Sequence, residues 1–141
     1  MFHDVADDPG SLAPEALREL YEAELRGVIE EHGIADVAEA SRVDESTLRA
    51  LADGESPELT LEEASAVMAV AEGTADAETI ATVSRDALLM GMTTAVLDVE
   101  AVESGIGGRL EAREIQSKIE GRFPLTLGEF ALLQQYIESE K

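Results

Sequence analysis

The sequence predicts an all-α chain made of two tandem units, each with the order helix, turn, helix, joined by one long helix. Apolar residues recur at helical spacing through most of the 141 residues, and no useful stretch alternates apolar and polar residues as a half-buried strand does. The same pattern of a glycine, a proline three residues later and then Leu-Thr-Leu also occurs twice, as G-E-S-P-E-L-T-L at 54–61 and G-R-F-P-L-T-L at 121–127. Since similar helical patterns flank both stretches, we interpret them as an internal repeat. We expect about seven or eight helices in all.

The charge balance indicates an unusual solvent environment. The chain has 31 acidic residues against 10 basic ones, which gives a formal net charge of −21, and the acids are spread along nearly its whole length. Molar salt suppresses the resulting self-repulsion, because the Debye length then falls to about 3 Å. We therefore interpret the chain as a haloarchaeal cytoplasmic protein. The alternative is an acidic mesophilic protein that binds a basic partner.

Several classes of protein are excluded by what the sequence lacks. There is no cysteine, so disulfides and thiolate metal sites are ruled out. The N-terminal stretch MFHDVADDPG is acidic and has no apolar segment typical of a secretory signal. The longest apolar run, at 87–97, is too short to span a bilayer. We expect a soluble cytoplasmic protein with no membrane partner.

The first unit is expected at 14–75, after a flexible acidic arm at 1–13. Pro14 suits the first turn of a long helix. Thr60 and Glu63 form the pattern of a capping box, in which each residue binds the backbone N–H of the other. The helices expected in this unit run from 15 to about 33, from 34 to 40, from 44 to 53 and from 60 to about 72.

A bridging helix is expected at 76–97, followed by a second, divergent unit at 98–141. Asp76 is placed to cap the bridging helix. In the second unit a helix is expected from 111 to 120, stopped by glycine. Thr126 and Glu129 then repeat the capping-box pattern of the first unit at the start of the last helix.

The short helices of the first unit carry a pattern of apolar, turn and stop positions. These positions are Val37, Ala38, Arg42, Val43, Asp44, Leu48, Leu51 and Gly54. On them, residues 34–72 resemble the lambda-repressor-like (XRE-type) helix-turn-helix family. Arg42 stands where that family has a glycine, so the turn must tolerate a left-handed residue or change shape. The whole chain also resembles an uncharacterised haloarchaeal protein family of unknown function, most closely in LLMGMTTAVLD and EIQSKIEG.

The first resemblance implies a DNA-binding surface. In that family the second short helix puts its N-terminal residues into the major groove. In the first unit two of the corresponding positions are acidic, which is unfavourable beside phosphate, whereas Ser46 and Arg49 can contact a base or a phosphate. The second unit has the only basic cluster. Its candidate residues are Arg109, Arg113, Gln116, Lys118 and Arg122.

Two functions from different classes remain open. The first is a DNA-associated regulator whose partner is double-stranded DNA. The second is a protein-interaction module with a degenerate helix-turn-helix fold that pairs with another protein, or with itself, through apolar helix faces. A basic and exposed surface over 109–122 favours DNA, whereas burial or neutralisation by acids favours protein.

We expect no enzymatic activity, cofactor or metal site. The only histidines are His3, in the N-terminal arm, and His32, near a helix C-terminus where a cation is favourable. The glycines at 105, 107 and 108 follow no strand and precede no G-K-[ST], so they predict a turn and not a phosphate loop.

The charge balance generates a testable prediction. The protein is expected to be compact in molar KCl and to loosen in dilute buffer, because 31 acids on solvated faces have too few bases to neutralise them. Circular dichroism against KCl concentration measures this. Unchanged helicity and melting temperature from low to high salt would remove the argument for a halophilic protein.

Overall fold

The described residues of the computed structural model, 2–71, 73 and 75–141, form eight α-helices and two 3₁₀-helices, with no β-strand among them. The α-helices are α1 (Pro14–His32), α2 (Ile34–Ser41), α3 (Glu45–Ala52), α4 (Leu61–Met68), α5 (Ala77–Ala95), α6 (Val99–Gly105), α7 (Ala112–Ile119) and α8 (Leu127–Ser139). The 3₁₀-helices are η1 (Phe2–Asp4) and η2 (Pro9–Ser11). The predicted all-α class is confirmed. In this described part, no single helix is long and apolar enough to cross a membrane, although the sharply bent pair of α5 and α6 passes that test jointly.

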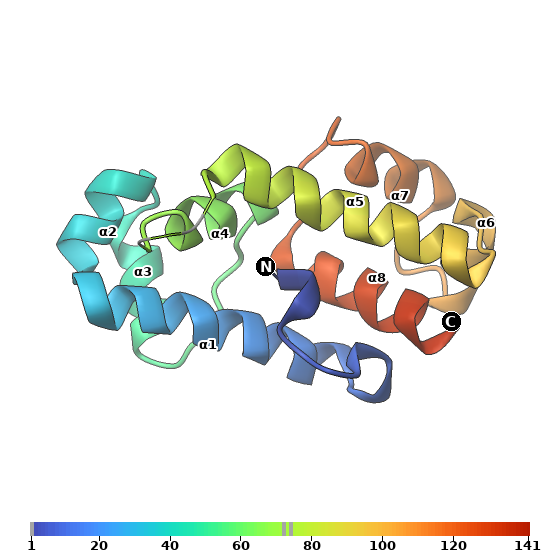
Figure 1. The fold of residues 1–141 in the computed structure, drawn as a ribbon, viewed down its shortest axis with the longest axis horizontal. Helices are drawn as coiled ribbons and strands as arrows, with labels where there is room; N and C mark the ends of the chain where they lie inside the picture. The colour runs from blue at the N-terminus through green and yellow to red at the C-terminus, as the bar shows by residue number, and fades with distance from the viewer. Residues whose placement is uncertain (1, 72, 74) are drawn as a thin grey trace.

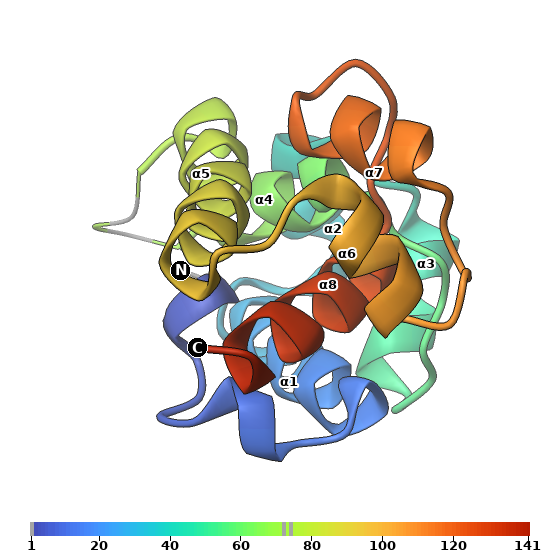
Figure 2. The same ribbon diagram turned by 90° about the vertical axis from the view of Figure 1, so that its right-hand side faces the viewer.

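The helices fall into two sets of four with a similar order of lengths. Helices α1 to α4 have 19, 8, 8 and 8 residues, and α5 to α8 have 19, 7, 8 and 13. The sets exchange partners, since α1 packs along α8 and α5 packs along α4. Figure 1 shows α8 between α5 and α1, and in the rotated view of Figure 2 it again lies centrally, with α5 and α7 above it. The helix expected as a bridge is α5, and its place in the second set corresponds to that of α1 in the first.

The two leucine–threonine–leucine segments meet where the sets join. Segments 59–61 and 125–127 run antiparallel, and the N–H of the last residue in each donates to the carbonyl of the first residue in the other, at 2.7 and 2.8 Å. Thr60 and Thr126 thereby form an isolated antiparallel bridge. All four leucines are at most 1% exposed. This reciprocal pairing is the ordinary pattern of an antiparallel ladder, confined here to a single residue pair.

Each bridging threonine also begins a helix. Thr60 Oγ1 accepts the Glu63 N–H at 3.1 Å, and Glu63 Oε1 accepts the Thr60 N–H at 3.0 Å. The same pair of bonds joins Thr126 and Glu129, at 3.0 and 2.9 Å. Both predicted capping boxes are confirmed. The bridge therefore fixes the starting points of α4 and α8 relative to each other.

The boundary between the two sets differs in part from the prediction. Helix α4 ends at Met68, whereas it was expected to continue to about Glu72 before a break; Glu72 and Thr74 lie outside the described residues. Asp76 caps α5 as predicted, and its carboxylate accepts the Thr79 N–H at 2.8 Å. This hydrogen bond favours the ionised form and so lowers the pKa of the Asp76 carboxyl.

The N-terminal segment corrects the expectation of a flexible arm at 1–13. Phe2 is almost fully buried, and its ring meets Tyr21 edge-on with 5.7 Å between centroids. Tyr21 packs in turn on Phe130 of α8, at 5.6 Å. The Gln134 side-chain nitrogen donates to a backbone carbonyl of this segment at 2.7 Å. The prediction was wrong because short 3₁₀ turns carry no apolar periodicity, so the anchoring role of one phenylalanine leaves no pattern in the sequence.

The sequence allowed either a left-handed Arg42 or a turn of different shape between α2 and α3, and the structure has the left-handed arginine. Arg42 is left-handed, with φ 63° and ψ 16°, at the position where the helix-turn-helix pattern has glycine. The Ser41 hydroxyl accepts the Val43 N–H at 3.2 Å and donates to the Val37 carbonyl at 2.6 Å. These bonds support the turn without a glycine. The left-handed backbone still costs an arginine about 1 to 2 kcal/mol, since its Cβ crowds the following carbonyl.

The bridge generates a stability prediction. Thr126→Ala is expected to lower the free energy of unfolding by about 1 kcal/mol, because it removes the side-chain half of the α8 capping box. Thr126→Ser keeps the hydroxyl and should restore most of the loss. Thermal unfolding in molar KCl measures both, and a drop of about 4 °C is expected for the alanine variant. Equal melting temperatures for the two variants would show that the cap contributes little.

Candidate interaction site

The candidate site is built on α7 and the loop that follows it. Ile115 and Ile119 are buried on one side of α7, whereas Arg113, Glu114 and Gln116 are exposed to solvent. Gly121 ends the helix region in a left-handed conformation, with φ 81°, and Pro124 prevents its continuation. The loop is thus held outward by backbone geometry, between α7 and the bridge at 125–127.

The structure pairs two of the four basic residues predicted in the second unit with acids and leaves the other two unpaired among the described residues. Arg109 and Arg113 are exposed, and in the described part neither has an ion-pair partner. Arg122 Nε lies 3.3 Å from the Glu120 carboxylate. The exposed Gln116 amide donates to the same carboxylate at 3.5 Å. A basic surface was expected here, and a mixed one is found.

Lys118 has a structural partner. Its Nζ lies 2.6 Å from Glu129 Oε2, and only 15% of the lysine side chain is exposed. Glu129 therefore uses both carboxylate oxygens, one for Lys118 and one for the capping box at Thr126. Lys118 is turned inward to support the start of α8. It is not available to a phosphate without breaking that support.

The tip of the first unit is acidic. Ser46 is exposed, and Arg49 Nη2 lies 2.9 Å from Glu45 Oε1, one helical turn earlier. Because Asp44 is exposed beside them, the tip carries a net negative charge. Such a surface repels phosphate, as the sequence predicted for this unit.

An apolar groove runs between α7 and the loop, and sequence reasoning did not find it. It holds about 490 Å³ and is lined by Phe123 and Pro124 on the loop side and by Arg113, Glu114, Ser117 and Lys118 on the helix side. The Phe123 side chain is 61% exposed. The sequence signal was present in the repeat, because Phe123 stands one residue before the proline, where the first unit has Ser56.

The corresponding loop of the first unit is held against α1 by hydrogen bonds. The Ser56 hydroxyl donates to the buried Glu22 carboxylate at 2.8 Å, and Arg18 Nη2 donates to the Pro57 carbonyl at 3.1 Å. Arg26 Nε adds a 2.6 Å bond to the Leu51 carbonyl at the end of α3. These contacts leave no exposed side chain comparable to Phe123. The two loops share a backbone plan but present different surfaces.

In the second set, one arginine holds the end of α7. Arg85 Nε donates to the Lys118 carbonyl at 3.0 Å, and its guanidinium also forms an ion pair with Glu62 of α4. A cation at a helix C-terminus is stabilising, because the last carbonyls carry partial negative charge. Arg85 therefore ties the C-terminal end of α7 to α5, and its ion pair with Glu62 links the same guanidinium to α4.

Among the described residues, no group of three or more histidines and acids is arranged to hold a metal ion. Partial burial lowers the pKa of His3, since it disfavours the charged imidazole. Burial raises the pKa of Tyr21, which lies in the core with its hydroxyl on Gln134. Both shifts arise from packing, and neither group faces the α7 groove.

The fold and this site define an all-α protein with an exposed apolar groove beside a short, charge-balanced helix. The chain belongs to a protein family of unknown function (DUF5791), whose model matches residues 17–140. The prediction of an uncharacterised family is thereby confirmed. No curated protein and no solved structure matches the chain.

The inward position of Lys118 can be tested by a pair of variants. Lys118→Met is expected to lower the free energy of unfolding by about 1 kcal/mol, because it leaves Glu129 without its cation in a partly buried place. Arg113→Met, on the exposed side of the same helix, should change stability by less than about 0.5 kcal/mol. Denaturant unfolding in molar KCl compares them. Equal effects would mean that the Lys118–Glu129 pair contributes nothing.

Proposed function

We propose that this protein is a non-enzymatic protein-interaction module whose helix-turn-helix-like units no longer read DNA. The observation that carries the proposal is the segment at 109–122, where acids pair with two of the four basic side chains and an apolar groove opens beside α7. The fold keeps two short helices joined by a turn, but a fold does not determine a function. The acidic composition supports a salt-rich, haloarchaeal cytoplasm as its setting.

The partner that suits the groove is a protein segment with an apolar anchor and basic flanks. Phe123 and Pro124 offer apolar contact area on one wall. Glu111 and Glu114 are exposed at the start of α7 and offer carboxylates on the other. In molar salt only close ion pairs contribute, because longer-range attraction is screened. The apolar anchor therefore supplies the affinity and the basic residues set its orientation.

The DNA-associated regulator remains the second candidate, on one specific observation. Arg109 and Arg113 are exposed, and in the described residues neither is engaged by an acid. Two free arginines can neutralise two phosphates. Since each released counterion contributes to affinity, two contacts support only weak binding in molar salt.

Selection from a random peptide library tests the proposal. The full chain, in molar KCl, is used as bait, with a counter-selection on Phe123→Ala. We expect enriched peptides with an apolar residue between lysines or arginines, and a loss of at least about tenfold in affinity for Phe123→Ala, since a buried aromatic anchor contributes much of such an interface. Leu20→Ala, on the exposed face of α1, is the matched control and should bind like the unmodified protein. No enrichment, or equal binding by both variants, would overturn the proposal.

A parallel measurement decides between the two candidates. Binding of sheared genomic DNA fragments is measured in the same buffer for the unmodified protein and for the Arg109→Ala, Arg113→Ala double variant. We expect no saturable binding by either. Saturable binding that the double variant loses would replace the interaction module with the DNA-associated regulator.

A further inference from the structure

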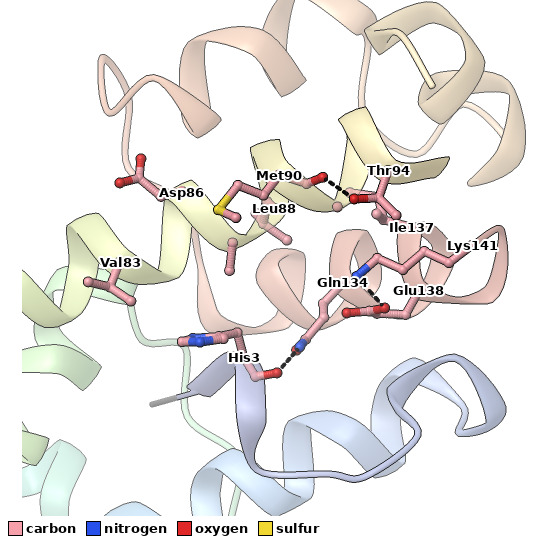
Figure 3. Close-up of a pocket in the computed structure, with 12 residues that line it drawn as sticks. His3, Val83, Asp86, Leu88, Met90, Thr94, Gln134, Ile137, Glu138 and Lys141 are labelled. Carbon is pink, nitrogen blue, oxygen red and sulfur yellow. Dashed lines mark hydrogen bonds and ion pairs between the residues drawn. The ribbon is translucent and has the colours of Figure 1, made fainter. Parts of the chain in front are cut away.

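A cavity lies between α5 and α8, where η1 also contacts α5. Figure 3 shows side chains of α5 along one side of it, and side chains of α8 together with His3 of η1 along the other. The cavity holds about 450 Å³ and shares no lining residue with the α7 groove. Pockets that bind small molecules hold roughly 300 to 1,000 Å³, so this α5–α8 cavity is large enough for one.

The lining of the cavity is mainly apolar. Leu88 and Gly91 of α5 and Ile137 of α8 form its buried part. Val83 and Met90 line it where it meets solvent, and they are 41% and 69% exposed. These side chains leave apolar surface in contact with water beside a hollow. A ligand with an apolar body removes that surface from water, which is favourable.

Gly91 lets α5 and α8 approach each other closely beside the cavity. A Cβ atom at this position would lie 2.8 Å from Ile137 Cγ2 and 3.6 Å from Lys141 Cε. The residue at the same position of α1 is Val28, which has a buried side chain. The walls are therefore two packed helices, as in ligand sites between the helices of a bundle.

Most polar groups around the cavity are already used within the chain. The Gln134 side chain accepts a hydrogen bond from the Tyr21 hydroxyl and donates one to the His3 carbonyl at 2.7 Å. The Lys141 ammonium lies 2.8 Å from the Glu138 carboxylate, and the two charges offset each other. Partial burial lowers the pKa of the His3 imidazole, which is therefore uncharged at neutral pH.

Asp86 differs from these groups. Its exposed carboxylate lines the cavity from α5 and has neither an ion pair nor a hydrogen bond with another described residue. The charged groups of the lining thus leave one negative charge without a partner. A ligand that matches this charge carries one positive group. The positive group must touch the carboxylate, because molar salt screens attraction over longer distances.

We propose that the α5–α8 cavity binds a small organic cation, a primary amine with an aliphatic or aromatic body. The ammonium donates hydrogen bonds to the Asp86 carboxylate, and the body lies against Leu88, Met90 and Ile137. A carboxylate ligand of the same size is repelled by Asp86 and finds Lys141 already paired. Potassium competes for Asp86 in molar KCl but gains nothing from apolar walls. Burial of the amine's apolar body therefore distinguishes the amine from potassium.

Amide NMR spectra of the full chain, titrated with n-hexylammonium chloride at constant molar KCl, test the proposal. Saturable shifts are expected for the amides of 83–94 and 134–141. The neutral analogue n-hexanol is expected to bind about threefold more weakly, since a solvent-exposed charge pair contributes a factor of this order. Hexanoate should not saturate. If n-hexylammonium shows no saturable binding, or binds no more tightly than n-hexanol, the proposed ligand class is wrong.

Two variants of α5 separate a specific contact from attraction by the net charge. Asp86→Asn is expected to weaken n-hexylammonium binding about threefold and to leave n-hexanol binding unchanged. Glu78→Gln is the matched control, because Glu78 is also an exposed acid of α5 but does not line the cavity. It should leave both affinities unchanged. Equal weakening by the two variants would show that the overall charge of −21 attracts the amine and that Asp86 holds no ligand.

Two neighbouring threonines test the place of binding. Thr93 and Thr94 are both exposed, and each hydroxyl bonds to the carbonyl four residues earlier, but only Thr94 lines the cavity. Thr94→Phe is expected to weaken binding of n-hexylammonium and n-hexanol at least about tenfold, because the ring occupies the space that the apolar body needs. Thr93→Phe is the matched control and should bind both as the unmodified protein does. Equal affinities for the two variants would place the ligand outside this cavity and refute the proposal.

Discussion

The antiparallel contact between segments 59–61 and 125–127 is the constraint on which the rest of the molecule depends. Two backbone hydrogen bonds join segments that are far apart in the sequence, and the leucines on either side of each threonine are buried. The same threonines start α4 and α8. One pair of residues therefore sets the separation, direction and starting point of the two helices on which α5 and α1 pack. The partner exchange between the two sets follows from this contact.

Sequence patterns predicted the local structure well, because helix ends have local causes. The all-α class and both capping boxes were readable from residues a few positions apart. The pairing of the two leucine–threonine–leucine segments was not predicted. The repeat was visible in the sequence, but the residues near each copy carry no information that the two copies are in contact. The buried position of Phe2 and the inward position of Lys118 were not predicted for the same reason. Whether a side chain points inward is decided by partners such as Tyr21 and Glu129, which lie far along the chain.

The candidate site was located only in part by the same reasoning. The basic residues from 109 to 122 were identified, but Lys118 is turned inward to Glu129. Amino-acid composition does not show which acidic and basic side chains lie within ion-pair distance of each other, as the Arg122–Glu120 contact illustrates. The exposed Phe123 was missed because a lone aromatic residue in a loop predicts nothing by itself. Its difference from Ser56 becomes informative only when the two residues, each one position before the proline of the repeat, are compared.

The aromatic core has a further consequence, for the independence of the two halves. Tyr21, the eighth residue of α1, packs on Phe130, the fourth residue of α8. The residues at the same positions of α5 and α4 are Ser84 and Ala64, both fully buried. The first half thus supplies one large and one small side chain, and the second half supplies their complements. Two copies of either half alone would bring a large residue against a small one at both places. The two halves are therefore not interchangeable, because a complete core needs the large side chain of one half at each place where the other half has its partner.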